Sequence, residues 1–151
     1  MTNPQTNFTW ELKAHPAFLA AHAQYIQDVK QETRSGAALK KTKSFKKLEY
    51  LIALTTQRIP SDPARDAYKL GKTLGGKNSL WRRAKFLQQY RLFFRYSSIS
   101  KVIVYAWVNN DDTWRAYGSK SDAYQVFRKM LEAGKVPNSW DDLMTEAKNL
   151  S

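Results

Sequence analysis

The chain has 151 residues, enough for one domain over residues 1–151, and 42% of them are hydrophobic. It contains 25 lysines and arginines against 13 aspartates and glutamates, so its formal net charge is +12. It has no cysteine, which excludes disulfides, thiolate metal sites and a cysteine nucleophile. The charge indicates a phosphate-rich partner first, with an anionic membrane surface or an acidic protein as alternatives.

The N-terminal part predicts a strand and then a helix. Residues 1–7 are polar and are expected to be frayed. Residues 8–14 alternate between apolar and polar side chains, as in a short strand. Pro16 suits the first turn of a helix, and apolar residues then recur at helical spacing over 17–30.

A second, longer helix is predicted over 37–59, ended by Pro60 and Pro63. Its lysine-rich part, 40–47, is interpreted as a solvated face that adds long-range attraction, because its lysines alternate poorly with apolar residues. No secretory signal or bilayer-spanning apolar run is visible. A cytoplasmic protein without membrane contact is therefore expected.

Residues 60–80 predict an extended connection punctuated by glycines. Tyr68, Leu70 and Leu74 are candidates to tether it to the core. The connection is either a plain tether or a docking site for RNA or a protein partner, through its lysines Lys69, Lys72 and Lys77.

The clearest signal is a run of three strands over 81–87, 90–97 and 101–108, whose short connections require antiparallel hairpins. Two helices follow, over 121–133 and 139–149, the first with Ser121 as its cap and Gly134 as its stop. The predicted fold is α+β with the order β-α-α-β-β-β-α-α, in which a twisted, mainly antiparallel sheet carries the two N-terminal helices and the C-terminal helices.

Familiar catalytic motifs are missing: the sequence has no HExxH motif, no P-loop and no GxGxxG. His15 and His22 lie near the N-terminus with only Glu11 and Asp28 close in sequence, so we interpret them as surface or half-buried side chains. Metal-dependent hydrolysis and two-histidine ribonuclease chemistry are both disfavoured, and no metal or cofactor is expected.

What remains is cationic chemistry on the strands. Period-2 alternation places Arg83 and Lys85 on one face of their strand, and Arg91, Phe93 and Arg95 on one face of the next. The opposite face of the second strand must be core; it carries Tyr90, Leu92, Phe94 and Tyr96. Cations around an aromatic ring would bind phosphate and stack a base, whereas the alternative is an ordinary solvated sheet face.

A second group of candidates follows the third strand. It consists of Arg115, Tyr117, Lys120 and Tyr124, and it precedes or opens the next helix, where backbone N–H groups also attract anions. The alternatives are a surface charge for Arg115 and a core aromatic for Tyr124.

Several segments together resemble the YhaV toxins of PrlF–YhaV type II toxin–antitoxin systems, within the RelE-like ribonuclease superfamily. The resemblance covers residues 8–145 and is carried by WELKAHPAF near the start, GKTLGGKN at 71–78, RAKF at 83–86, YRLFFRYSS at 90–98, KVIVYAWVNN at 101–110 and RAYGSKSDAYQVFRKML at 115–131. It implies a RelE-like fold and endonucleolytic cleavage of mRNA, on free RNA or within the ribosome. It also implies a PrlF-type antitoxin and binding of operator DNA by the toxin–antitoxin complex.

The resemblance also implies roles for single residues. Arg83, Lys85, Arg91, Arg115 and Tyr124 are the expected catalytic residues. The resemblance adds Lys120 as an RNA-binding residue, and the pattern of charges and aromatic residues gives Arg95, Phe93, Tyr117 and Lys77 as the other expected RNA-binding residues.

In the implied reaction, the ribose 2′-OH attacks the adjacent phosphate without a metal, leaving a 2′,3′-cyclic phosphate and a 5′-OH. Lys85 is the expected base, Arg91 and Arg115 clamp the phosphoryl oxygens, and Tyr124 orients the 2′-OH or stacks on a base. Two rival classes are a non-catalytic, basic nucleic-acid-binding regulator and an inactive scaffold that binds an acidic partner.

Overall fold

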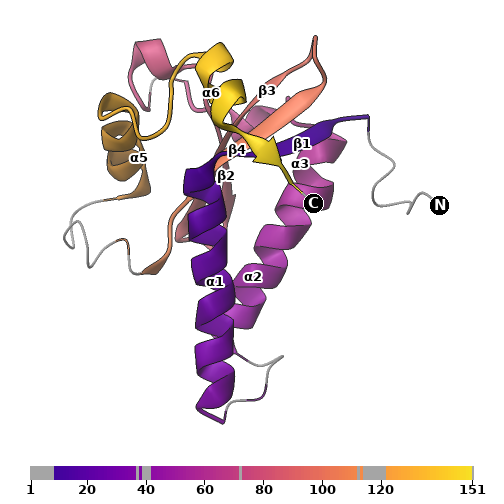
Figure 1. Cartoon of the computed structure of the whole chain (residues 1–151), viewed down its shortest axis with the longest axis vertical. Coiled ribbons are helices and arrows are strands. Elements are labelled where there is room, and N and C mark those ends of the chain that lie inside the picture. Colours follow the sequence, from indigo (N-terminus) through magenta and orange to yellow (C-terminus); the bar gives the residue numbers. More distant parts are fainter. Residues whose placement is uncertain are drawn as a thin grey trace.

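The computed structural model describes residues 9–36, 38, 42–71, 73–111, 113 and 122–150, with only the backbone at residue 77. One sheet organises the fold (Figure 1), with strands in the order β2-β3-β4-β1-β5. The strands are β1 (Glu11–Ala14), β2 (Arg82–Phe86), β3 (Tyr90–Ser97), β4 (Val102–Val108) and β5 (Lys148–Asn149). Strand β1 runs parallel to β4, and the other pairs are antiparallel. The prediction of an α+β fold is confirmed, with a mixed sheet.

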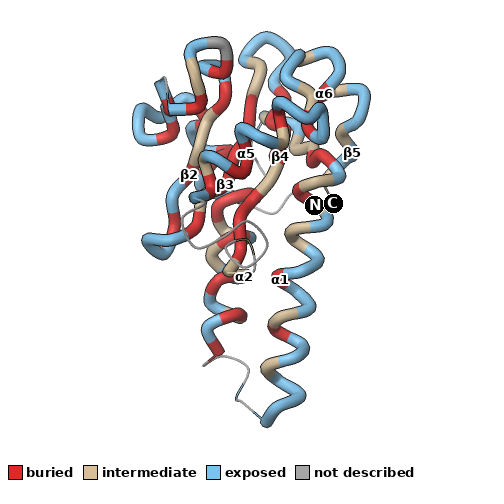
Figure 2. The backbone as a smooth tube through the Cα atoms, turned by 90° about the vertical axis from the view of Figure 1, so that its left-hand side faces the viewer, coloured by how far each residue is buried: buried red, intermediate tan, exposed pale blue. Residues whose placement is uncertain are grey.

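Helices α1 (Pro16–Arg34) and α2 (Lys43–Ala53) form a hairpin that extends beyond the sheet in both views of the chain (Figures 1 and 2). Pro16 occupies the first turn of α1, as predicted, where its missing N–H costs no helical hydrogen bond. Thr42 caps α2, because its side chain accepts a hydrogen bond from the backbone N–H of Phe45.

The second predicted helix was wrong at both ends, since α2 begins at Lys43 and helical structure continues past Pro60. A π-helical turn, η3 (Leu54–Arg58), leads directly into α3 (Ile59–Ser61). Pro60 lies in the first turn of α3, where proline is tolerated, and the helix ends just before Asp62, which precedes Pro63.

The sheet is buried on both faces. One core lies between the sheet and the α1–α2 hairpin, and it contains Tyr90, Leu92 and Phe94 of β3, as predicted. The second core lies under α5 (Ala123–Glu132) and α6 (Trp140–Glu146), and it contains Phe93 of the same strand. Successive residues of β3 are therefore buried, whichever face of the sheet they lie on (Figure 2). Alternation within one strand could not reveal that both faces are covered.

The connection before β2 is compact. It contains two short 3-10 turns, η4 (Asp66–Tyr68) and η5 (Gly76–Asn78), and Lys69 forms a bridge with Arg82 at the start of β2. Tyr68, Leu70 and Leu74 are buried, which confirms the predicted tether. The segment is held against the sheet instead of being a free extended loop.

The C-terminal elements differ from the prediction in two places. Asp122 caps α5 by accepting a hydrogen bond from the backbone N–H of Gln125, whereas the predicted cap, Ser121, lies outside the described residues. Gly134 ends the helix with a φ of 75°, as expected. The last helix stops at Glu146, and the chain then adds β5 beside β1, so the predicted string of elements was incomplete. No helix in the described part of the chain is long and apolar enough to cross a bilayer.

Candidate active site

The β2–β3 hairpin places its cations by register. Lys85 lies opposite Arg91, and Arg83 lies opposite Phe93, so all four side chains share one face of the sheet. Leu87 and Gln88 in the turn adopt positive φ values of 47° and 68°, which closes the hairpin directly beside Arg91.

Tyr124 joins this face from the first turn of α5. Its phenol oxygen accepts hydrogen bonds from Arg83 Nη1 at 2.8 Å and from Arg91 Nε at 3.1 Å. Both guanidinium carbons lie 5.9 Å from the centre of the Tyr124 ring. We call Arg83, Tyr124 and Arg91 the Arg–Tyr cluster. Because the phenol oxygen accepts both bonds, its own proton remains available for a ligand.

Ring contacts with α5 and hydrogen bonds to neighbouring residues fix the positions of the residues in the Arg–Tyr cluster. The Tyr124 ring meets Phe93 edge-on at 5.8 Å, and Phe93 stacks on Phe127 of α5 at 4.4 Å. The backbone N–H of Arg91 donates to Asn109 Oδ1 at 2.6 Å, and Arg91 Nη1 donates to the carbonyl of Gln88 at 2.8 Å. The positions of both guanidiniums are thus largely set before any ligand arrives.

Charge on this face is not neutralised internally. Within the described residues, no carboxylate forms an ion pair with Arg83, Lys85 or Arg91. A hollow of about 240 Å³ opens beside Arg91 and Tyr124, and Asp122, the cap of α5, also lines it. A phosphate in this hollow would meet the Arg91 guanidinium and the phenol proton together.

Two residues predicted to bind RNA from this face are placed elsewhere. Phe93 is fully buried beneath α5, so its ring offers no exposed stacking surface. Arg95 is 8% exposed; its guanidinium lies over the rings of Trp81 and Trp140 and donates to the carbonyl of Asn138 at 2.5 Å. The predicted open face was wrong, because alternation identified the face but not the helices that cover it, whereas RNA binding by Arg95, which lines a separate hollow beside Trp140, stays a prediction.

The predicted residues of the segment after β4 are described in part only. Tyr124 lies in α5, whereas Arg115, Tyr117 and Lys120 lie outside the described residues. At Lys77, the structure describes the backbone alone.

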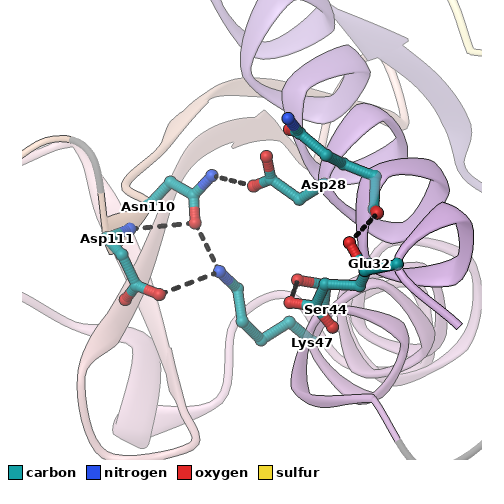
Figure 3. A pocket seen from close by; sticks show the side chains of 8 residues that line it. Asp28, Glu32, Ser44, Lys47, Asn110 and Asp111 are labelled. Atoms are coloured by element: carbon teal, nitrogen blue, oxygen red, sulfur yellow. Dashed lines mark hydrogen bonds and ion pairs between the residues drawn. The ribbon is translucent and has the colours of Figure 1, made fainter. Parts of the chain in front are cut away.

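A second polar centre surrounds Lys47, as Figure 3 shows. Lys47 is 2% exposed, its Nζ donates to Asn110 Oδ1, and it lies 3.6 Å from an oxygen of Asp111. Asn110 Nδ2 in turn donates to Asp28 at 2.9 Å. The prediction of a wholly solvated lysine face was therefore wrong at Lys47. Helical spacing carried the missing signal, since Lys47 lies four residues before the buried Leu51.

The charges of this centre shift one another's titration. Burial lowers the pKa of Lys47, although Asp111 and Asp28 partly oppose that effect. Burial acts to raise the pKa of Asp111, but the hydrogen bond from Tyr90 and the charges of Lys47 and Lys43 outweigh it, so the pKa lies below its ordinary value. Every carboxylate of the centre already has a partner, which favours a structural role.

The two histidines are not paired with each other. His15 caps α1 through Nδ1, which accepts from the backbone N–H of Ala17 at 3.0 Å, and its Nε2 lies 2.8 Å from Glu146. His22 stacks on Phe18 at 5.7 Å, and burial lowers its pKa. In the described ranges, no group of three His, Asp or Glu side chains could hold a metal ion.

Comparison with known proteins adds a decisive observation. The model of the YhaV toxin family, described as a toxin with endonuclease activity of a toxin–antitoxin system, matches residues 12–148. The chain belongs to the YhaV toxin family. It is 39% identical to "Ribonuclease toxin YhaV" of Escherichia coli K12 over 98% of both chains. It is also 39% identical to "Toxin YhaV" of Escherichia coli O157:H7 and 38% identical to that of strain O6:H1, again over 98% of both chains.

No solved structure matches the chain. The YhaV family match runs from the second residue of β1 to the first residue of β5, so it includes the β2–β3 hairpin and α5. The whole Arg–Tyr cluster therefore lies within the matched region.

Proposed function

We propose that this YhaV family member is a ribonuclease toxin that cleaves mRNA, without a metal, at the Arg–Tyr cluster. The observation that carries the proposal is the phenol of Tyr124 held between two guanidiniums, Arg83 and Arg91, that have no carboxylate partner among the described residues. The name of the K12 relative, a ribonuclease toxin, supports RNA as the substrate.

The proposed reaction is an internal transphosphorylation. The ribose 2′ oxygen forms a bond to phosphorus while the bond from phosphorus to the 5′ oxygen breaks, giving a 2′,3′-cyclic phosphate and a 5′-OH. The 2′-OH proton passes to a base, and a proton is returned to the leaving 5′ oxygen, so no water is consumed. The step needs stabilisation of the extra negative charge on the phosphoryl oxygens.

Each residue of the cluster has a defined task in this proposal. Arg83 and Arg91 donate to the non-bridging phosphate oxygens, and Tyr124 uses its free proton to orient the 2′ oxygen or a phosphate oxygen. Lys85, exposed and directly across from Arg91, is the proposed base, because it is the one amine in the β2–β3 hairpin. A cationic cluster of this kind would repel a metal ion, which favours a metal-free mechanism.

Three further proposals come from the family resemblance. The fold is of the RelE-like type, the antitoxin is of the PrlF type, and the toxin–antitoxin complex binds its operator DNA. The family's membership of toxin–antitoxin systems supports a protein antitoxin as partner. Cleavage can take place on free mRNA or in the ribosome, and an assay with and without ribosomes separates the two.

The test is cleavage of a defined RNA by purified protein with end mapping of the products. Arg91→Ala and Arg83→Ala should each lower the cleavage rate by about 10²–10³-fold, as expected for loss of a transition-state donor. Arg34→Ala, at the exposed far end of α1, serves as the matched control. Wild-type rates in both variants would contradict the cluster, and loss of cleavage in EDTA would contradict the metal-free step. Salt-sensitive RNA binding without cyclic-phosphate ends would favour a non-catalytic regulator.

A further inference from the structure

A second hollow, of about 350 Å³, lies at the outer edge of the sheet beside β2. It is walled by the end of α2, the turn η3, the connection around η4 and strand β2 itself. Four cations and two tyrosines line it: Arg58, Arg65, Arg83, Lys85, Tyr50 and Tyr68. No carboxylate is among its lining residues, which is the arrangement that an anionic ligand requires.

Two of the four cations, Arg58 and Arg65, contact aromatic rings and not carboxylates. Arg58 Nη1 donates to the Tyr50 hydroxyl at 2.7 Å, and the Arg58 guanidinium lies 4.6 Å from the centre of the Tyr50 ring. The Arg65 guanidinium lies 5.8 Å from the centre of the Tyr68 ring. Among the described residues, neither arginine forms an ion pair, so both charges remain available.

Phe86, Tyr50 and Arg58 form a stacked column. The rings of Phe86 and Tyr50 are 5.6 Å apart and inclined by only 18°, and Arg58 covers the Tyr50 ring. Arg58 is an exposed residue at the end of this column. Unpaired RNA bases stack on planes of this kind.

Arg83 connects this hollow to the Arg–Tyr cluster. Its Nη1 donates to Tyr124, while its Nη2 donates to the carbonyl of Ala67 in the wall of the hollow at 3.2 Å. Lys85 lines the same hollow and faces Arg91 across the hairpin. A strand bound at the cluster can therefore continue into the hollow without leaving the positive surface.

We propose that this hollow is a binding subsite for the nucleotide next to the cleaved phosphate, in which the Arg58 guanidinium stacks on the base and the charges of Arg58 and Arg65 each pair with a phosphate. The proposal rests on the proposed ribonuclease function but concerns substrate binding, not the reacting atoms. Because the ligand is single-stranded RNA, the site should favour an unpaired segment over a duplex, whose bases cannot reach the stacking plane.

Binding is tested apart from cleavage with a 2′-O-methyl RNA oligonucleotide of about eight nucleotides, a length within the usual span of single-strand sites. This probe lacks the 2′-OH and cannot be cut. The full-length double variant Arg58→Gln/Arg65→Gln is compared with Lys30→Gln/Arg34→Gln, which removes the same charge from exposed positions on α1. Fluorescence anisotropy at several salt concentrations gives the affinity and its salt slope.

The Arg58→Gln/Arg65→Gln variant should bind about tenfold more weakly than the control, since stacking and two phosphate contacts are lost. The slope of log affinity against log salt should fall by about 1.4, which is two charges at ~0.7 each for a single strand. On cleavable RNA, the loss in kcat/KM should come mainly from KM. Arg65→Gln alone, which removes no hydrogen bond among the described contacts, should show half of the change in slope and guards against misfolding of the double variant.

The other possible results bear on the subsite, on a protein partner or on the proposed function. Equal affinities and slopes in the Arg58→Gln/Arg65→Gln and control variants would overturn the subsite, as would a lower kcat with an unchanged KM. Unchanged RNA binding with loss of the antitoxin complex would assign the hollow to an acidic protein segment instead. If the wild type cuts no RNA, the proposed function fails, whereas the binding measurement still decides whether the subsite exists.

Discussion

Replacing Tyr124 by phenylalanine isolates the one atom that joins the two arginines of the cluster. The variant keeps the ring that meets Phe93 and removes the oxygen that accepts from Arg83 at 2.8 Å and from Arg91 at 3.1 Å. A hydrogen bond from a charged donor contributes about 1.5–3 kcal/mol, and the partly exposed position of these residues places both bonds near the lower limit.

The expected effect on catalysis can be measured separately from the effect on folding. Without the oxygen, the guanidiniums lose their common acceptor and the 2′ oxygen loses its donor, so we expect the single-turnover cleavage rate to fall about 10²-fold, or ~2.7 kcal/mol. The fold should survive, because Asn109 still holds the backbone of Arg91. Thermal unfolding measured beside the cleavage assay separates the two effects.

Tyr96→Phe is the matched control for this experiment. Tyr96 lies on β3, is partly exposed, and makes no hydrogen bond through its hydroxyl among the described contacts; its ring packs edge-on against Trp10. Cleavage by Tyr124→Phe within about threefold of the wild type, less than 0.7 kcal/mol, would refute the role given to the phenol.

Three further predictions concern the polar centres outside the cluster. Asp111→Asn should destabilise the fold by about 1–3 kcal/mol at neutral pH, measured by urea unfolding, because buried Lys47 loses a charged partner. The difference in unfolding free energy between the wild type and this variant should shrink as the pH falls below 3.8, where the carboxylate of the wild type becomes protonated. The wild type should gain stability relative to Lys47→Met as the pH rises towards 10.5, because the lowered pKa of Lys47 makes the unfolded wild type hold more protons in that window; the same alkaline slope in both proteins would contradict this. His15→Ala should cost about 1 kcal/mol by loss of the α1 cap, and an unaltered melting temperature would show that water replaces the bond to Ala17.

The hairpin could be predicted from the sequence because its information is local. Alternation over 90–97 and the short turn before it specify both strands. The register that brings Lys85 opposite Arg91 was not specified, because the turn takes up residues 87–89, one residue more than predicted. The same alternation cannot say what lies above each face, so Phe93 and Arg95 were placed on an open surface that α5 and α6 cover.

Long-range contacts explain the rest of what was missed. Arg58 and Arg65 lie in segments with no recognisable motif, and they meet Lys85 only because η3 and η4 fold back along β2. The two residues of β5 are too few to show any period. Tyr124 was a candidate from the sequence, but its catalytic role came from the family resemblance, because its distance from Arg83 in the sequence hides their contact in space.

The parallel pairing of β1 with β4 has a consequence for how the chain acquires its structure. Glu11 pairs with Val102, and β5 then covers the other side of β1, so the centre of the sheet joins the first, middle and last parts of the polypeptide. Contacts so distant in sequence are slow to form, whereas the β2–β3 hairpin needs only its own residues. During synthesis, the basic hairpin is therefore expected to form early, and the completed sheet must wait for the C-terminus to leave the ribosome. A nascent chain would thus expose its cations before it has a finished core.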